Sequence, residues 1–443
     1  MTQTILFSQR CFLEGTLLPA TVYLREGRIE KIVEGDALPE GATDLGSAVL
    51  MPGVIDAHVH INEPGRTDWE GFETATDAAA KGGITVLVDM PLNSAPVTTS
   101  VPALQQKLDA SSGKLRVHVG FYGGLVPGNA PEMEALAAAG VLGIKAFLTH
   151  SGIDDFPNAT EADLHAAMPV LAKMGLPLLV HCELDEPGTT EALQQNTSSY
   201  NAYLSSRPKE WENKAVQLMI DKCRRHRCRV HIVHVSSAEA LPLIAAAKKE
   251  GLPITAETAP HYILFNAEDV PDGQTMYKCA PPIRERANNE LLKEALCAGT
   301  LDFLATDHSP APPSIKELES GNLAKAWGGI AGLQFLLPAG WTALKETMTL
   351  EDFIPLVTAA PARFLGLDDR KGQLRVGFDA DLVAWHPEAP VRISAAEVAH
   401  RHKISPYIDH PLFGRIAQTW VGGAPQLPLS GTQQKQGKWL FRK

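Results

Sequence analysis

The chain has 443 residues, enough for one large barrel with an accessory domain, and its 44% hydrophobic and 21% charged residues are typical of a globular protein. Its formal net charge of −11 argues against nucleic acid or an anionic membrane as a partner, because both need clustered Lys and Arg. The sequence has no apolar run of the roughly 18 to 20 residues that a membrane-spanning helix needs. The six cysteines form no Cys-x-x-Cys pair, so we expect reduced thiols in a cytoplasmic protein.

The two ends of the chain share a pattern of alternating apolar and polar positions. Apolar and polar positions alternate from Thr21 to Val33, where Gly27 marks a hairpin turn. The alternation returns over residues 372–385 and 416–421. We therefore predict one small β domain made from residues 1–52 and 372–443.

The middle of the chain, residues 53–371, alternates short apolar runs with amphipathic stretches. Strands that alternate with helices pair in parallel, and eight such units predict an α/β fold of the closed (β/α)8 barrel type, with an open doubly wound sheet as the alternative. The predicted strands are residues 54–61, 84–90, 116–121, 141–148, 177–182, 229–235, 253–257 and 303–306. The predicted helices are residues 74–81, 132–139, 161–174, 213–225, 238–250 and 289–298.

Metal-binding side chains stand at the carboxyl ends of four predicted strands, where the reactive groups of such barrels lie. Residues i and i+2 of a strand point to the same face, so the first strand can direct two imidazoles to one point. Neutral imidazole and carboxylate groups are ligands for divalent metals. The residues concerned are His58, His60, His181, His234 and Asp307.

Two neighbours of these residues are expected to point away from the site. Cys182 directly follows a candidate ligand, so strand alternation directs its thiol into the core rather than toward a nucleophilic role. His231 stands at an odd separation from His234, and we expect it to face outward.

Lys145 ends the fourth predicted strand in an apolar context, where a charged ammonium is costly to bury. One interpretation is a salt bridge from Lys145 to an acid such as Asp307. The other is reaction of its amine with carbon dioxide to give an anionic carbamate, whose two oxygens can bridge two cations. The residues alone leave both interpretations open.

Together, the His-Val-His pattern of residues 58–60, which follows Pro-Gly-Val-Ile-Asp, and the ligand candidates on later strands resemble the cyclic amidohydrolase branch of the amidohydrolase superfamily. The likeness extends over nearly the whole chain. It implies a TIM barrel beside a composite β-sandwich domain from the two chain ends. It also implies a carboxylated Lys145 and a hydroxide that together bridge two divalent metal ions, for which we expect zinc.

The resemblance also implies roles for single residues. His58, His60 and Asp307 hold the more buried metal, and His181 and His234 hold the more exposed one. The shared hydroxide attacks a ring amide carbonyl, and Asp307 carries the proton from the hydroxide to the leaving nitrogen. A non-catalytic scaffold of the same fold is disfavoured, because all six ligand positions are filled.

Single residues and short segments that differ among the related enzymes indicate the substrate. Asn62 occupies the position at which dihydroorotases carry a carboxylate-binding Arg, and His150 the position at which hydantoinases carry a Tyr. Segments such as 62–66, 307–313 and 326–334 resemble allantoinases. This implies a cyclic ureide substrate, allantoin, opened to allantoate in purine degradation. Hydantoinase, dihydropyrimidinase and dihydroorotase activities are the alternatives.

The remaining expectations concern substrate contacts and assembly. We expect Asn62, Asn93 and Cys279 to contact the substrate. Relatives are often tetramers, so the resemblance implies a homotetramer.

Overall fold

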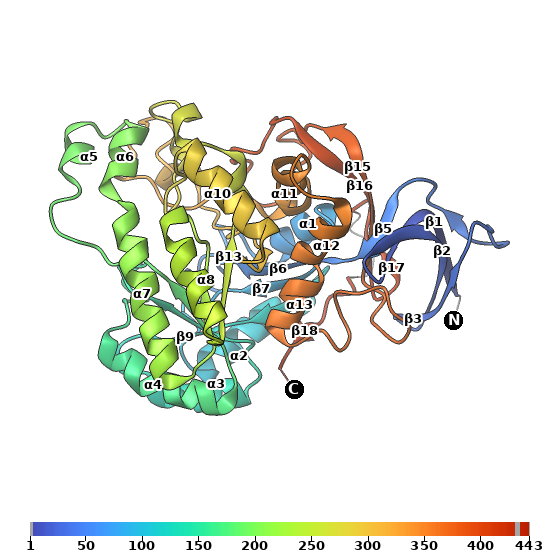
Figure 1. Cartoon of the computed structure of the whole chain (residues 1–443), viewed down its shortest axis with the longest axis horizontal. Coiled ribbons are helices and arrows are strands. Elements are labelled where there is room, and N and C mark those ends of the chain that lie inside the picture. The colour runs from blue at the N-terminus through green and yellow to red at the C-terminus, as the bar shows by residue number, and fades with distance from the viewer. Residues whose placement is uncertain (1–2, 430–434, 443) are drawn as a thin grey trace.

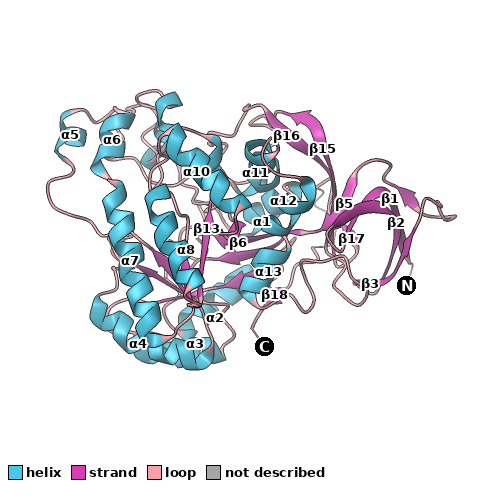
Figure 2. Cartoon of the chain, in the orientation of Figure 1, coloured by secondary structure: helices cyan, strands magenta, loops and turns pink. Residues whose placement is uncertain are grey.

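A ring of short parallel strands forms the centre of the structure, which is a computed structural model that describes residues 3–429 and 435–442. Helices surround the ring, and a mixed, mostly antiparallel sheet lies at one end of the molecule (Figures 1 and 2). Within these residues no helix is both long and apolar enough to cross a membrane.

The ring contains all eight strands that the sequence predicts. Leu142 N donates to Phe121 O at 2.9 Å between the third and fourth strands, and His60 N donates to His308 O at 2.8 Å to join the last strand region to the first. The predicted closed α/β barrel is therefore confirmed. Its strands are β6 (Val54–Val59), β7 (Ile84–Asp89), β8 (His118–Phe121), β10 (Ile144–Phe147), β11 (Leu178–His181), β12 (Val230–Ile232), β13 (Ile254–Thr258) and β14 (Phe303–Leu304). The two-residue strands β9 (Gly123–Gly124) and β18 (Trp439–Leu440) pair with β10 and β8, respectively.

Helices cover the outside of the barrel, and α4 illustrates how the sequence sets their ends. Thr160 and Asp163 form a reciprocal capping box at its start, and Gly175 adopts the left-handed conformation at its end, so this helix has the bounds predicted from the sequence. The helices are α1 (Phe72–Lys81), α2 (Val101–Ser111), α3 (Met133–Ala138), α4 (Glu161–Met174), α5 (Glu191–Gln195), α6 (Tyr200–Ser206), α7 (Lys209–His226), α8 (Leu241–Lys249), α9 (Pro260–Leu264), α10 (Arg286–Cys297), α11 (Leu336–Leu344), α12 (Leu350–Val357) and α13 (Ala359–Leu365).

The barrel strands are buried on both faces, as parallel strands under helices must be. Val86 and Val88 pack with Ile55 and Phe303 in one buried cluster, whereas the intervening Leu87 belongs to the cluster beneath the helices. This alternation separates the barrel interior from its outer layer and aims every second side chain of a strand at the barrel axis.

The accessory sheet takes strands from both the N-terminal and the C-terminal parts of the chain (Figure 1). The two parts meet where Val49–Pro52 pairs with the strand that begins at Leu382. The predicted hairpin turn is present, with positive φ at both Glu26 and Gly27. The C-terminal strand begins at Leu382 rather than at residue 372, because the chain before it runs through turns. The division of the chain after residues 52 and 371 stays a prediction. The strands are β1 (Thr4–Leu13), β2 (Thr16–Arg25), β3 (Arg28–Glu34), β4 (Thr43–Asp44), β5 (Val49–Pro52), β15 (Leu382–Val391), β16 (Leu412–Val421) and β17 (Ala424–Pro425).

Candidate metal centre

One cavity of about 420 Å³ opens at the carboxyl ends of the barrel strands. The loops that follow several strands form its walls, and strand-end side chains form its floor. All six ligand candidates line this one cavity, although they are spread over 250 positions of the sequence. They are His58, His60, Lys145, His181, His234 and Asp307.

Two imidazoles of the first strand region converge on one carboxylate oxygen. His58 Nε2 lies 3.2 Å and His60 Nε2 lies 3.3 Å from Oδ1 of Asp307. The other ring nitrogen of His58, Nδ1, lies 2.6 Å from Oε1 of Glu257. A carboxylate on the far nitrogen fixes the orientation of the ring, as it does for metal-bound histidines.

A second pair of imidazoles meets beside the first. His181 Nδ1 and His234 Nε2 lie 3.0 Å apart, and His181 Nε2 lies 2.6 Å from Oε2 of Glu183. Ligand atoms of His58, His234 and Asp307 lie within 4.8 Å of one another. These described residues therefore form a candidate metal-binding cluster.

Burial sets the charge states of these groups. It lowers the pKa of the His58, His181 and His234 imidazoles, which are therefore neutral at pH 7 and present lone pairs. Burial raises the pKa of Glu183, but the Arg207 charge and the hydrogen bond from His181 outweigh it and lower that pKa to about 2. Glu183 is therefore a carboxylate throughout the physiological range.

Lys145 is fully buried and its Nζ has no hydrogen-bond partner among the described residues. The ring centre of Phe147 lies 4.9 Å from Nζ. The salt bridge to Asp307 considered from the sequence is not formed. Burial lowers the pKa of Lys145 to about 8, which leaves part of the population as the neutral, nucleophilic amine. An unpaired buried amine among converging ligand atoms fits a site that a modified lysine and metal ions complete.

The backbone at two candidate ligands adopts the left-handed conformation, which is uncommon outside glycine. φ is 39° at His234 and 46° at Asp307, and both residues lie just beyond the ends of their strands. Strained residues of this kind are concentrated at functional sites.

The expectation that His231 faces outward is wrong. Its side chain is buried, with Nε2 3.1 Å from Oε2 of Glu257 and its ring stacked on Phe303. Strand alternation fails here because β12 ends at Ile232 and His234 follows with positive φ. His231 and His58 thus share the two oxygens of Glu257.

The residues that hold the histidines were missed by the sequence analysis. Glu257 lies on β13, and Glu183 stands two positions after His181, at the same spacing as the first His pair. This two-residue spacing could have indicated that Glu183 lies on the same side of the chain as His181. Arg207 carried no signal, because it reaches Glu183 from the segment after α6.

The three predicted substrate contacts occupy different places. Asn93 lines the cavity, whereas Asn62 and Cys279 are buried and are not among the described residues that line it. Asn62 Nδ2 lies 3.4 Å from Pro310 O. The cavity wall also contains polar side chains that the sequence did not single out, including Ser206, Arg207 and Lys278, and it contains Trp327 of the segment 326–334.

Cys182 lies in the buried core, as predicted. Burial raises the pKa of its thiol, which makes it a poor nucleophile. Cys297 is the exposed one of the six cysteines. We expect a thiol reagent to modify one cysteine per native chain and six after unfolding, with Cys297→Ser eliminating the native reaction. Rapid labelling of Cys182 in the folded protein, measured by peptide mass spectrometry, would contradict this assignment.

Comparison with known proteins places this chain in a family. A model of the amidohydrolase family matches residues 49–425. An allantoinase of Streptomyces avermitilis is 44% identical over 97% of this chain and 96% of its own, and an allantoinase of Arabidopsis thaliana is 45% identical over 86% and 78%. The solved L-hydantoinase (dihydropyrimidinase) of Arthrobacter aurescens superposes with a TM-score of 0.91 at 29% identity, over 99% of both chains. This chain belongs to the amidohydrolase family.

Proposed function

We propose that this protein is an allantoinase, which hydrolyses the cyclic amide of allantoin's hydantoin ring to give allantoate in purine degradation. One observation carries the proposal: six ligand-type side chains meet in one cavity of a chain 44% identical to an allantoinase over nearly its full length. The proposed activity requires a small cyclic ureide as the substrate.

The donor set suits two divalent ions, and we propose zinc. His58, His60 and Asp307 would hold one ion, His181 and His234 would hold the other, and a carboxylated Lys145 would supply a further ligand. When bound, such ions lower the pKa of water and polarise a carbonyl oxygen. The neutral imidazoles and the buried, unpaired Lys145 Nζ support this assignment.

Asp307 is the proposed proton carrier. Its Oδ1 faces His58 and His60, and its side chain lines the cavity. It takes the proton of the attacking water and gives it to the ring nitrogen that leaves. A carboxylate is suited to this task because it can accept and return one proton without moving.

The cavity wall supplies the contacts to the ring. Asn93 lines the cavity, and its Oδ1 is buried without a hydrogen-bond partner among the described residues, so it can accept a ring N–H. We keep Asn62 and Cys279 as proposed contacts through the loops that carry them. The carbonyl of Cys279 accepts a hydrogen bond from the Tyr203 hydroxyl at 2.6 Å, and Tyr203 itself lines the cavity.

A substrate panel tests the proposal. Allantoin, hydantoin, dihydrouracil and dihydroorotate are offered separately to the zinc-loaded protein, and ring opening is followed by absorbance and product analysis. We expect the highest kcat/KM with allantoin. Preferential turnover of hydantoin or dihydrouracil would instead favour the hydantoinase reading, which the fold of the Arthrobacter aurescens enzyme keeps as second candidate.

Location and assembly are part of the same proposal. We propose a cytoplasmic homotetramer, with residues 1–52 and 372–443 as the accessory domain and residues 53–371 as the catalytic barrel. All six cysteines are free thiols, which agrees with a reducing compartment. Sedimentation velocity tests the tetramer.

A further inference from the structure

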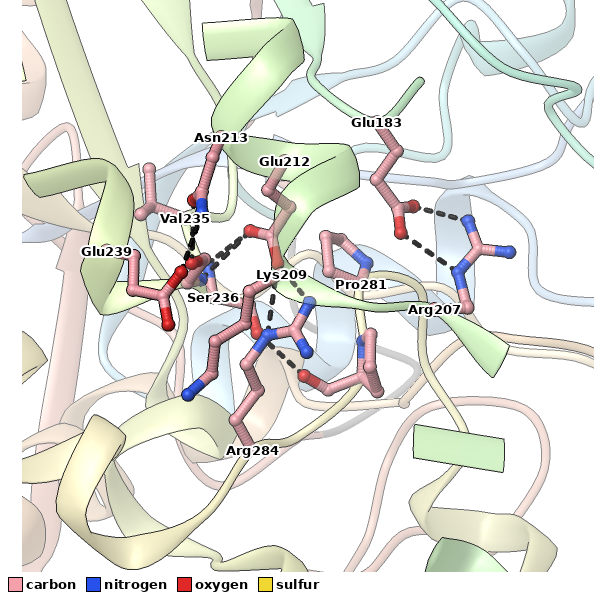
Figure 3. Close-up of polar contacts among 12 residues, drawn as sticks. Glu183, Arg207, Lys209, Glu212, Asn213, Val235, Ser236, Glu239, Pro281 and Arg284 are labelled. Atoms are coloured by element: carbon pink, nitrogen blue, oxygen red, sulfur yellow. Dashed lines mark hydrogen bonds and ion pairs between the residues drawn. The ribbon is translucent and has the colours of Figure 1, made fainter. Parts of the chain in front are cut away.

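A short chain of polar groups connects the cavity wall to the ring of His181. His181 Nε2 lies 2.6 Å from Oε2 of Glu183, whose side chain is fully buried. Arg207 donates to both oxygens of that carboxylate, from Nε to Oε1 at 3.0 Å and from Nη2 to Oε2 (Figure 3). The guanidinium and the imidazole therefore share one carboxylate.

This arrangement fixes which nitrogen of His181 carries the proton. A carboxylate whose two oxygens accept from a guanidinium only accepts hydrogen bonds, so Nε2 of His181 carries the proton and its N–H donates a hydrogen bond to Glu183. The lone pair is then on Nδ1, the atom that lies 3.0 Å from His234 Nε2. Without the carboxylate, the proton could occupy Nδ1 and block that lone pair.

Arg207 brings the cavity wall into this chain of contacts. Arg207 directly follows α6 and lines the cavity. The segment between β11 and α7, which forms part of the cavity wall, therefore ends near the residue that binds Glu183. Two parallel hydrogen bonds from a planar guanidinium leave the carboxylate little freedom to rotate. Other residues of this segment that line the cavity are Thr190, Leu193, Tyr203 and Ser206.

We propose that Glu183 and Arg207 are positioning residues for His181, which hold its Nδ1 toward the cavity and thereby maintain the site of the second metal ion. The inference rests on the proposed function, because it takes His181 as a ligand of that ion. Neither residue touches the reacting atoms in this scheme.

The chain offers matched controls for the loss of a buried carboxylate. Asp381 lies 3.3 Å from His118 Nε2 and pairs with Lys371, so it also joins a buried histidine to a cation. His118 begins β8, at the barrel end opposite the cavity. A second control is Glu212, whose carboxylate accepts hydrogen bonds from Arg284 (Figure 3) and from the backbone N–H groups of Ser236 and Ser237.

The test is metal binding to Glu183→Gln and Asp381→Asn, measured by equilibrium dialysis at buffered free zinc. A single amide oxygen cannot serve both the guanidinium and the imidazole, so we expect Glu183→Gln to keep the first ion and to bind the second about 10- to 100-fold more weakly. Wild type and Asp381→Asn should bind two ions with equal affinity. Arg207→Lys, which keeps the charge but loses the fork, should weaken the second ion to a smaller extent.

Two further readouts separate positioning from general damage. Saturating zinc should restore much of kcat in Glu183→Gln, and the absorption spectrum of the cobalt-substituted protein should change in that variant and not in Asp381→Asn. If Glu183→Gln does not fold, the same measurements on Arg207→Lys test the inference, and weaker binding of the second ion is the expected result. Unchanged affinity for both ions, or equal loss in Asp381→Asn, would overturn the inference and leave the proposed function standing. Failure of wild type to bind two ions would overturn both.

Discussion

Asp307→Asn should lower kcat for allantoin by about 10⁴-fold, because an amide can neither accept the proton of the attacking water nor deliver one to the leaving nitrogen. The substitution also weakens the ligand that faces His58 and His60 at 3.2 and 3.3 Å. KM should change far less than kcat, since the lost group acts mainly in the transition state.

The fold should survive this change. Asn tolerates the left-handed conformation that Asp307 adopts, with φ of 46°, and its side chain has nearly the same size. Thermal unfolding of Asp307→Asn beside wild type is the control. Activity within tenfold of wild type in a folded, zinc-loaded variant would remove Asp307 from the proposed mechanism.

Lys145→Ala should lower activity by more than about 100-fold. Lys145 is a proposed direct metal ligand, and the loss of such a ligand costs more than the roughly 10- to 100-fold typical of residues that hydrogen-bond to a ligand. The deleted side chain leaves space beside Phe147 at the cavity floor. Acetate or propionate should enter that space and restore part of the activity, since each supplies two oxygens like those of the proposed carbamate.

Two observations check the modification itself. Native mass spectrometry of wild type at neutral pH should show a gain equal to one carbon dioxide, which acid removes. Short acids should leave Asp307→Asn inactive, because that variant lacks a proton carrier rather than a bridging group. Undiminished activity of Lys145→Ala would refute the carbamate.

Much of the fold was predictable because its signals are local. Each barrel strand is a short apolar run, and α4 carries its start and end signals in Thr160, Asp163 and Gly175. The accessory hairpin was equally local, through the turn at Gly27. The start of β15 was predicted too early because residues 372–381 alternate like a strand but form turns.

The site was predictable in kind but not in detail. Strand ends supplied the imidazoles and the carboxylate, and the resemblance to a family supplied their grouping. The orientation of His231 could not be read from alternation, because alternation requires a continuous strand and the chain leaves β12 before His234. Apart from Asn93, the polar residues of the cavity wall such as Ser206, Arg207 and Lys278 were missed, because they come from separate loops, for which sequence periodicity carries no information.

The sequence by itself determined the alternation of strands and helices, the ligand types at the strand ends and the family. Only the tertiary structure decided how the candidate ligands are held. Glu257 meets His58 across 199 positions of sequence, and Arg207 reaches Glu183 from beyond α6. Such contacts depend on barrel closure and on left-handed backbone at His234 and Asp307, which bring distant residues together by geometry that no local pattern encodes.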